Sequence, residues 1–335
     1  MRARSFEAGP MVVLAATLAL AAVSHGCRSA PAHGGTRGTS PDFIEPLDLV
    51  EIERDAVLRI NADLVPGPLT MDVAIVIPSN LDPGFDLVSV PQMLDGIRSA
   101  KEIFGAVGVQ IRLLWVKTGP VPDQHLSITS TDLLTGPGSK HAGMYTNFQR
   151  HPRPLSAGAR AAFESLVPRD EANDRTLYLV VLQDVFYPFF ASSGAGNDLV
   201  PTVTPTSGLS FPPYIHGREI PRRLRGVITI SNLTAGANRF KTIAHEIGHK
   251  TLNVSHEYRT IDPEFEVVGE GGLMIYGAGV EIPSGADGRW HRERLERSPF
   301  LYREDESGKK LWNPDFEDGG HYFDPIYGDF VVGEE

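Results

Sequence analysis

The residues with the clearest chemical potential are His245, Glu246 and His249, in the stretch AHEIGHK. Two histidines four residues apart project from the same face of a helix, about one turn apart, so both imidazoles can bind one metal ion. Zinc is the metal that this ligand type and spacing favour. Glu246 stands beside the first histidine, where its carboxylate can act as a general base toward a water molecule that the metal activates. The pattern therefore predicts metal-assisted hydrolysis.

A catalytic zinc site needs a third protein ligand. His256 follows in HEIGHKTLNVSHE, where Asn253 suits the left-handed conformation that ends helices and lets the chain turn back. A carboxylate is the alternative, because Glu270 lies at a workable distance along the chain, although the glycines around it disfavour a helix there. We expect His256 to be the third ligand and keep Glu270 as the alternative.

These residues resemble the signature of the metzincin clan of zinc peptidases, HExxHxxGxxH. The pattern here, HExxHxxxNxxH, is one residue longer. The resemblance covers about residues 225–277 and implies a metzincin-like catalytic domain, in which the zinc ligands are His245, His249 and His256.

A second part of the resemblance lies in the stretch GGLMIYG. Met274 follows the third histidine, as does the methionine that metzincins carry in a tight turn beneath the zinc. In two branches of the clan, a tyrosine two residues after that methionine can approach the zinc, and Tyr276 occupies the matching place. The resemblance implies that Tyr276 ligates the metal or donates its hydroxyl to the oxyanion. The alternative is that Met274 and Tyr276 are ordinary core residues with no role at the metal.

The elements that must position these residues read as an α/β (α+β) domain. Apolar, β-branched runs predict strands at 71–77 and 109–117, with a helix between them that begins after Ser89. The run 177–182 is almost wholly apolar and predicts a buried central strand. Further helices are expected over about 156–166, 238–252 and 287–297. We expect a mixed twisted sheet with an active-site helix that carries HExxH.

Two segments before that helix carry specific expectations. The stretch 187–222 is rich in Gly, Pro, Ser and Thr, which is typical of a long functional loop or a disordered segment. The segment 225–231 alternates as an edge strand does, and the resemblance implies that a peptide substrate pairs with it by β-addition.

Charge and cysteine content exclude several kinds of partner and site. The formal net charge of -11 argues against nucleic acid as a partner, because phosphate binding needs clustered Lys and Arg. Cys27 is the single cysteine, so an intrachain disulfide and a multi-cysteine zinc site are both excluded.

The first residues read as a signal peptide over 1–26. Two arginines precede an apolar run at 11–23, which is too short to span a bilayer, and small residues follow it. Cleavage after Gly26 would leave Cys27 at the new terminus, as in a bacterial lipoprotein, although ordinary signal peptidase would accept the same site. Residues 27–46 are expected to form a flexible linker and 47–335 the catalytic domain with a C-terminal extension.

We therefore expect an exported zinc endopeptidase, secreted or anchored to the cell-envelope membrane through a lipidated Cys27, that acts on peptides or proteins. One alternative is a catalytically idle zinc-binding surface protein on a peptidase scaffold, which the intact Glu246 argues against. Another is a zinc amidase of cell-wall peptides. Substrate specificity and oligomeric state stay open.

Overall fold

The computed structural model describes residues 47–82, 88–132, 154–169, 174–192, 199–211, 220–231, 233, 241–252, 272–274, 281–283, 289–313, 321–324 and 328–331. All of them belong to one compact unit, Ile44–Glu335. The predicted signal peptide and nearly all of the predicted linker fall in the other unit, Met1–Phe43, outside the described residues.

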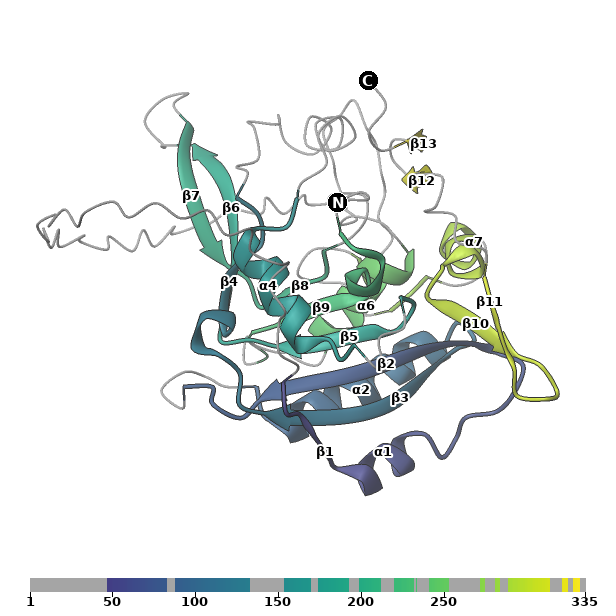
Figure 1. Cartoon of the computed structure of the whole chain (residues 1–335). Coiled ribbons are helices and arrows are strands. Elements are labelled where there is room, and N and C mark those ends of the chain that lie inside the picture. The colour runs from purple at the N-terminus through teal and green to yellow at the C-terminus, as the bar shows by residue number, and fades with distance from the viewer. Residues whose placement is uncertain are drawn as a thin grey trace, which may run out of the picture. The chain divides into compact units, whose positions relative to one another are not determined.

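A mixed sheet forms the centre of this unit (Figure 1), in the order β1-β3-β2-β5-β9-β8. Its four inner strands run parallel to one another: β2 (Leu69–Pro78), β3 (Val109–Gly119), β5 (Leu177–Val181) and β9 (Val227–Ile230). Both edges are antiparallel, formed by β1 (Val50–Ile52) and β8 (Gly208–Leu209). The α/β fold class expected from the sequence is confirmed.

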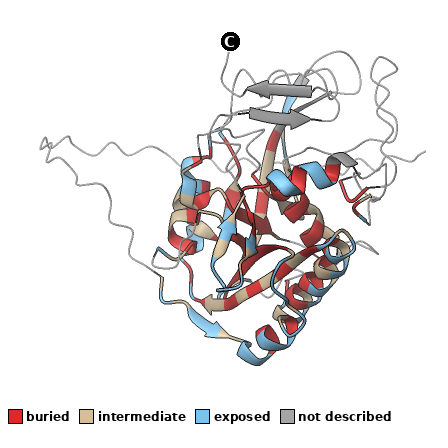
Figure 2. Cartoon of the chain, turned by 90° about the vertical axis from the view of Figure 1, so that its right-hand side faces the viewer, coloured by how far each residue is buried: buried red, intermediate tan, exposed pale blue. Residues whose placement is uncertain are grey.

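Helices cover both faces of the sheet because side chains along each strand alternate between two cores. Met71, Val73 and Ile75 of β2 join the core on the side of α1 (Arg54–Ile60), α2 (Val90–Gly105) and α6 (Lys241–Leu252). Ala74 and Val76 join the core beneath α4 (Ala157–Leu166). Figure 2 shows buried residues concentrated in the sheet and along the inner sides of the helices.

The elements predicted from periodicity are confirmed. Ser89 caps α2: its hydroxyl accepts from the Gln92 amide, and the Gln92 side chain accepts from the Ser89 amide. β5 is buried over its whole length and lies in the middle of the sheet, as its apolar run predicts. The Ser156 hydroxyl caps α4 by accepting from the Ala159 amide, and α7 (Arg289–Arg297) forms within the predicted range 287–297.

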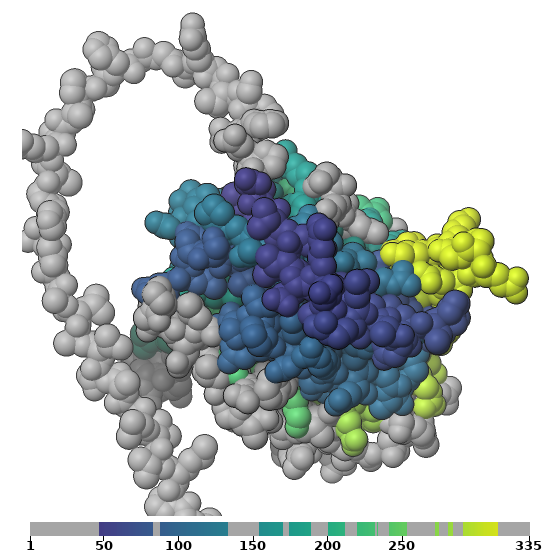
Figure 3. All heavy atoms as spheres, turned by 90° about the horizontal axis from the view of Figure 1, so that it is seen from below, coloured from purple at the N-terminus to yellow at the C-terminus, as the bar shows by residue number. Residues whose placement is uncertain are grey.

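The C-terminal part adds strands to this body. β10 (Leu301–Glu304) pairs with β11 (Lys310–Trp312) and also with the first half of β2. A second short pair is formed by β12 (His321–Asp324) and β13 (Gly328–Val331). Figure 3 shows the face that carries β1 and α1 in purple, with the β10–β11 pair in yellow at its border.

Two sequence-based expectations are wrong. The segment 187–222 is not a structureless loop, since β6 (Asp184–Ser192), β7 (Leu199–Pro205) and β8 form there. β6 and β7 make an antiparallel hairpin, and β4 (Ser127–Thr129) pairs with β6 to complete a three-stranded sheet. The pairing between these strands outweighs the preference of their residues for turns. The segment 225–231 does not form an edge strand, because β9 is buried between β5 and β8.

Within the part of the chain that the structure describes, no helix has both the length and the apolar character needed to cross a membrane. The apolar run 11–23 lies outside that part.

Candidate metal site

The helix α6 carries all three residues of the predicted motif and is held on its apolar side by the core. Ile243, Ala244 and Ile247 are wholly buried in the core that α6 shares with α2 and the sheet. Their spacing is that of one helix face, so burying this face fixes the rotation of α6 about its axis. The same rotation determines where the motif side chains point.

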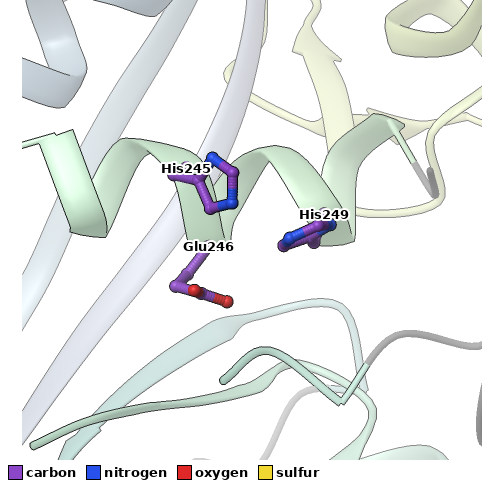
Figure 4. A group of neighbouring side chains, drawn as sticks. All are labelled: His245, Glu246 and His249. Atoms are coloured by element: carbon purple, nitrogen blue, oxygen red, sulfur yellow. The ribbon is translucent and has the colours of Figure 1, made fainter. Parts of the chain in front are cut away.

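His245, Glu246 and His249 lie together along α6 (Figure 4), each with one ligand atom within 4.8 Å of those of the other two. The two imidazole rings meet edge to face, with centroids 4.7 Å apart and planes at 85°. His245 is half-buried, whereas Glu246 and His249 are buried, at 7% and 5% exposed. These three residues can hold a metal ion, as the spacing of the motif predicts.

The orientation of the His245 ring is set by a backbone carbonyl. Its Nδ1 atom lies 2.8 Å from the carbonyl oxygen of Leu273, a contact that requires a proton on Nδ1. The other nitrogen, Nε2, is then the one that can bind a metal, which is the usual arrangement for a ligating histidine. Leu273 is itself held, because its amide donates to the carbonyl of Glu281. The donor set therefore fits a metal ion in its chemistry and in its outer support.

Met274 is wholly buried, and its sulfur lies beside Gly248 of α6. A Cβ atom at Gly248 would lie 2.5 Å from the Met274 sulfur, so only glycine allows this approach. Gly248 lies between Glu246 and His249 on the helix. The thioether therefore packs directly against the helix backbone between the candidate ligands, where an adaptable side chain fills the gap.

Glu246 faces the short edge strand β8. A Cβ atom at Gly208 would lie 2.8 Å from Cγ and 3.0 Å from Oε1 of Glu246, so the glycine makes room for the carboxylate. Burial raises the pKa of Glu246 to about 8, while a hydrogen bond from the Ser210 hydroxyl and the positive charge of Lys250 act to lower it. The Glu246 carboxylate is thus shielded from bulk water, and Ser210 and Lys250 are polar groups that act on it.

Lys250 follows His249 directly and is completely buried. Its amine donates to the carbonyl oxygen of Phe211 at 2.8 Å and to the carbonyl oxygen of Arg225. Phe211 lies just after β8, and Arg225 lies just before β9. Lys250 therefore connects α6 to the backbone just after β8 and just before β9.

The C-terminal end of α6 is closed by α7. The Arg294 guanidinium, which is buried, donates from Nε to the carbonyl oxygen of Leu252, the last residue of the helix. A cation at this end also complements the negative pole of the helix dipole. This hydrogen bond ties α7 to the last turn of α6.

Three of the predicted site residues, His245, Glu246 and His249, are brought together. His256, the alternative ligand Glu270 and Tyr276 lie outside the described residues, and so does Cys27. Sequence reasoning missed Ser210 and the Leu273 carbonyl, which no local pattern marks. It also missed Lys250, for which a signal exists: it lies three residues after Ile247, a spacing that puts a charged residue beside the packed side of α6.

No protein-family model matches the chain, and no curated protein matches its sequence. What is known of the site therefore rests on its geometry, a His-Glu-His group on a buried helix that can hold a metal ion.

Proposed function

We propose that this protein is a zinc-dependent peptidase. The observation that carries the proposal is the combination of two histidines and a glutamate on one buried helix, with the His245 ring fixed by the Leu273 carbonyl. Pure metal binding does not need a carboxylate between the two histidines, whereas hydrolysis needs a base at that place. In this proposal His256, which lies outside the described residues, is the third ligand.

A bound zinc ion would polarise the scissile carbonyl and lower the pKa of water at the site. Glu246 accepts the proton from the attacking water and later delivers it to the leaving amine. Its burial supports both steps, because a raised pKa makes the carboxylate a stronger base than an exposed one and brings its proton exchange close to neutral pH. His245 and His249 would hold the zinc ion together with His256. Tyr276 donates its hydroxyl to the oxyanion that develops during the reaction.

The edge strand β8 supports a peptide as the substrate. Among the described residues it pairs with β9 alone, so its other side can add an extended peptide by backbone hydrogen bonds. Gly208 of β8 lies directly beside Glu246, which would place a peptide paired with this strand close to the general base. β8 takes the part that the resemblance assigned to the segment 225–231.

The experiment is cleavage of a mixed peptide library by the purified protein, compared with Glu246→Gln at equal zinc content. We expect cleavage by the wild type, loss of cleavage in the variant, and loss on adding a chelator. If the zinc-loaded wild type cuts no peptide across neutral pH, the reading as a zinc-binding surface protein replaces this proposal. Cleavage confined to cell-wall peptides would instead identify an amidase.

A further inference from the structure

We propose that Lys250 and Ser210 form a positioning pair that holds the Glu246 carboxylate in place for catalysis, an inference that rests on the proposed function. Neither residue is part of the motif HExxH. Both are buried, Lys250 completely and Ser210 almost completely. Their hydrogen bonds link α6 and the end of β8 into one unit.

The first link runs from α6 to the backbone after β8. Lysine is rarely buried, and its amine must find acceptors when it is. The Lys250 amine donates to two backbone carbonyls, those of Phe211 and Arg225. An apolar side chain could fill the same volume without the cost of desolvating a charge. What the Lys250 amine adds is its hydrogen bonds, which hold the backbone at Phe211 and Arg225 in place.

The second link passes through Phe211. Its φ angle is 50°, in the left-handed region that residues other than glycine seldom adopt. Such a conformation persists where the surroundings determine it fully. Here the Lys250 amine binds the Phe211 carbonyl, and the buried Phe211 ring packs edge to face on Phe163 of α4, with centroids 4.9 Å apart.

The third link returns to α6. Ser210, the residue before Phe211, donates its hydroxyl to the Glu246 carboxylate. Glu246 and Lys250 are four residues apart on one helix face, so the connection Lys250–Phe211–Ser210–Glu246 closes into a ring. Without Lys250, the backbone at Phe211 loses its anchor on α6. Without Ser210, the carboxylate loses a donor that fixes its direction.

The test compares Ser210→Ala, Lys250→Met and the double variant by kcat and KM for a peptide that the wild type cleaves. Groups that support an active-site residue typically change activity by about 10- to 100-fold. We expect kcat to fall by that factor in each single variant, with KM and zinc affinity within about twofold of wild type. Because the residues act in series, the double variant should be no slower than the slower single variant.

Two variants serve as matched controls. Lys241→Met removes a lysine from the start of the same helix, and Ser165→Ala removes a buried serine from α4. Both should keep the wild-type kcat. Full activity in Ser210→Ala would overturn the proposal, as would multiplicative losses in the double variant.

Hydrogen exchange separates this proposal from the proposed function. In Lys250→Met, backbone amides of residues 207–211 should exchange at least about tenfold faster than in wild type, while those of β2 keep their rates. If the wild type cleaves no peptide, the proposed function fails, and hydrogen exchange alone tests whether Lys250 holds the backbone at residues 207–211. Faster exchange in Lys250→Met supports this, and unchanged exchange overturns it. Ser210→Ala removes only a hydroxyl, so it keeps the kinetic test available if Lys250→Met does not fold.

Discussion

Replacing Glu246 by glutamine should change how the stability of the chelator-treated protein depends on pH. Burial is the main reason that the pKa of Glu246 rises from 4.5 to about 8. A carboxyl group with a higher pKa in the folded than in the unfolded state binds its proton more tightly when folded. Its contribution to stability is therefore fully present below about pH 4.5 and is lost as the pH rises through about 8.

The size of the effect follows from the shift. One pKa unit corresponds to about 1.4 kcal/mol, so a rise from 4.5 to about 8 makes roughly 5 kcal/mol of the unfolding free energy pH-dependent. Most of this lies between pH 5 and pH 8, where we expect a loss of about 3 to 4 kcal/mol. Glutamine has the shape of the protonated side chain and does not titrate, so Glu246→Gln should lack this component.

Urea unfolding at several pH values, in the presence of chelator, measures the free energy of unfolding of both proteins. The difference between wild type and Glu246→Gln cancels the titration of the other acidic residues. That difference should fall steadily with rising pH, and added zinc should reduce the slope because a cation favours the ionised carboxylate. A difference that varies by less than about 1 kcal/mol from pH 5 to pH 8 would refute the reasoning, since Glu246 would then be ionised throughout that range.

Two further predictions concern packing. Gly226→Ala should lower the free energy of unfolding by at least about 2 kcal/mol, because the new Cβ would lie 1.8 Å from the carbonyl oxygen of Thr176 and backbone must move. At Gly158 an added Cβ would meet no atom closer than 3.9 Å, so Gly158→Ala should leave the free energy of unfolding unchanged or raise it by up to about 1 kcal/mol, as measured by chemical denaturation. Equal losses of stability in Gly226→Ala and Gly158→Ala would contradict this prediction. Met274→Ala should cost about 2 to 5 kcal/mol and weaken zinc binding, because it opens a cavity against Gly248, whereas a loss below about 1 kcal/mol would show that the methionine does not support the helix.

Much of the fold could be predicted because local patterns and tertiary packing agree. The Ser89 cap and the spacing of apolar residues place α2, and the unbroken apolar run over 177–182 identifies the central strand. The hairpin of β6 and β7 could not be predicted in this way, because its stability comes from pairing between strands whose own composition favours turns. For the same reason, the edge strand was expected at β9 and not at β8.

The candidate site divides in a similar way. His245, Glu246 and His249 lie on one helix, so their spacing alone predicts that they meet. The groups that support them come from distant parts of the chain. The Leu273 carbonyl reaches His245 across 28 positions, and the carbonyl that Lys250 binds on Phe211 is 39 positions away. Backbone carbonyls carry no sequence signature, so only the fold reveals these contacts.

The most direct test of the central claim combines zinc binding with cleavage. Zinc affinity and hydrolysis of a peptide library are measured for the wild type and for Glu246→Gln. The proposed function predicts one tightly bound zinc ion in both proteins, with cleavage by the wild type alone. Failure of the wild type to bind zinc, or equal cleavage by the two proteins, would contradict it.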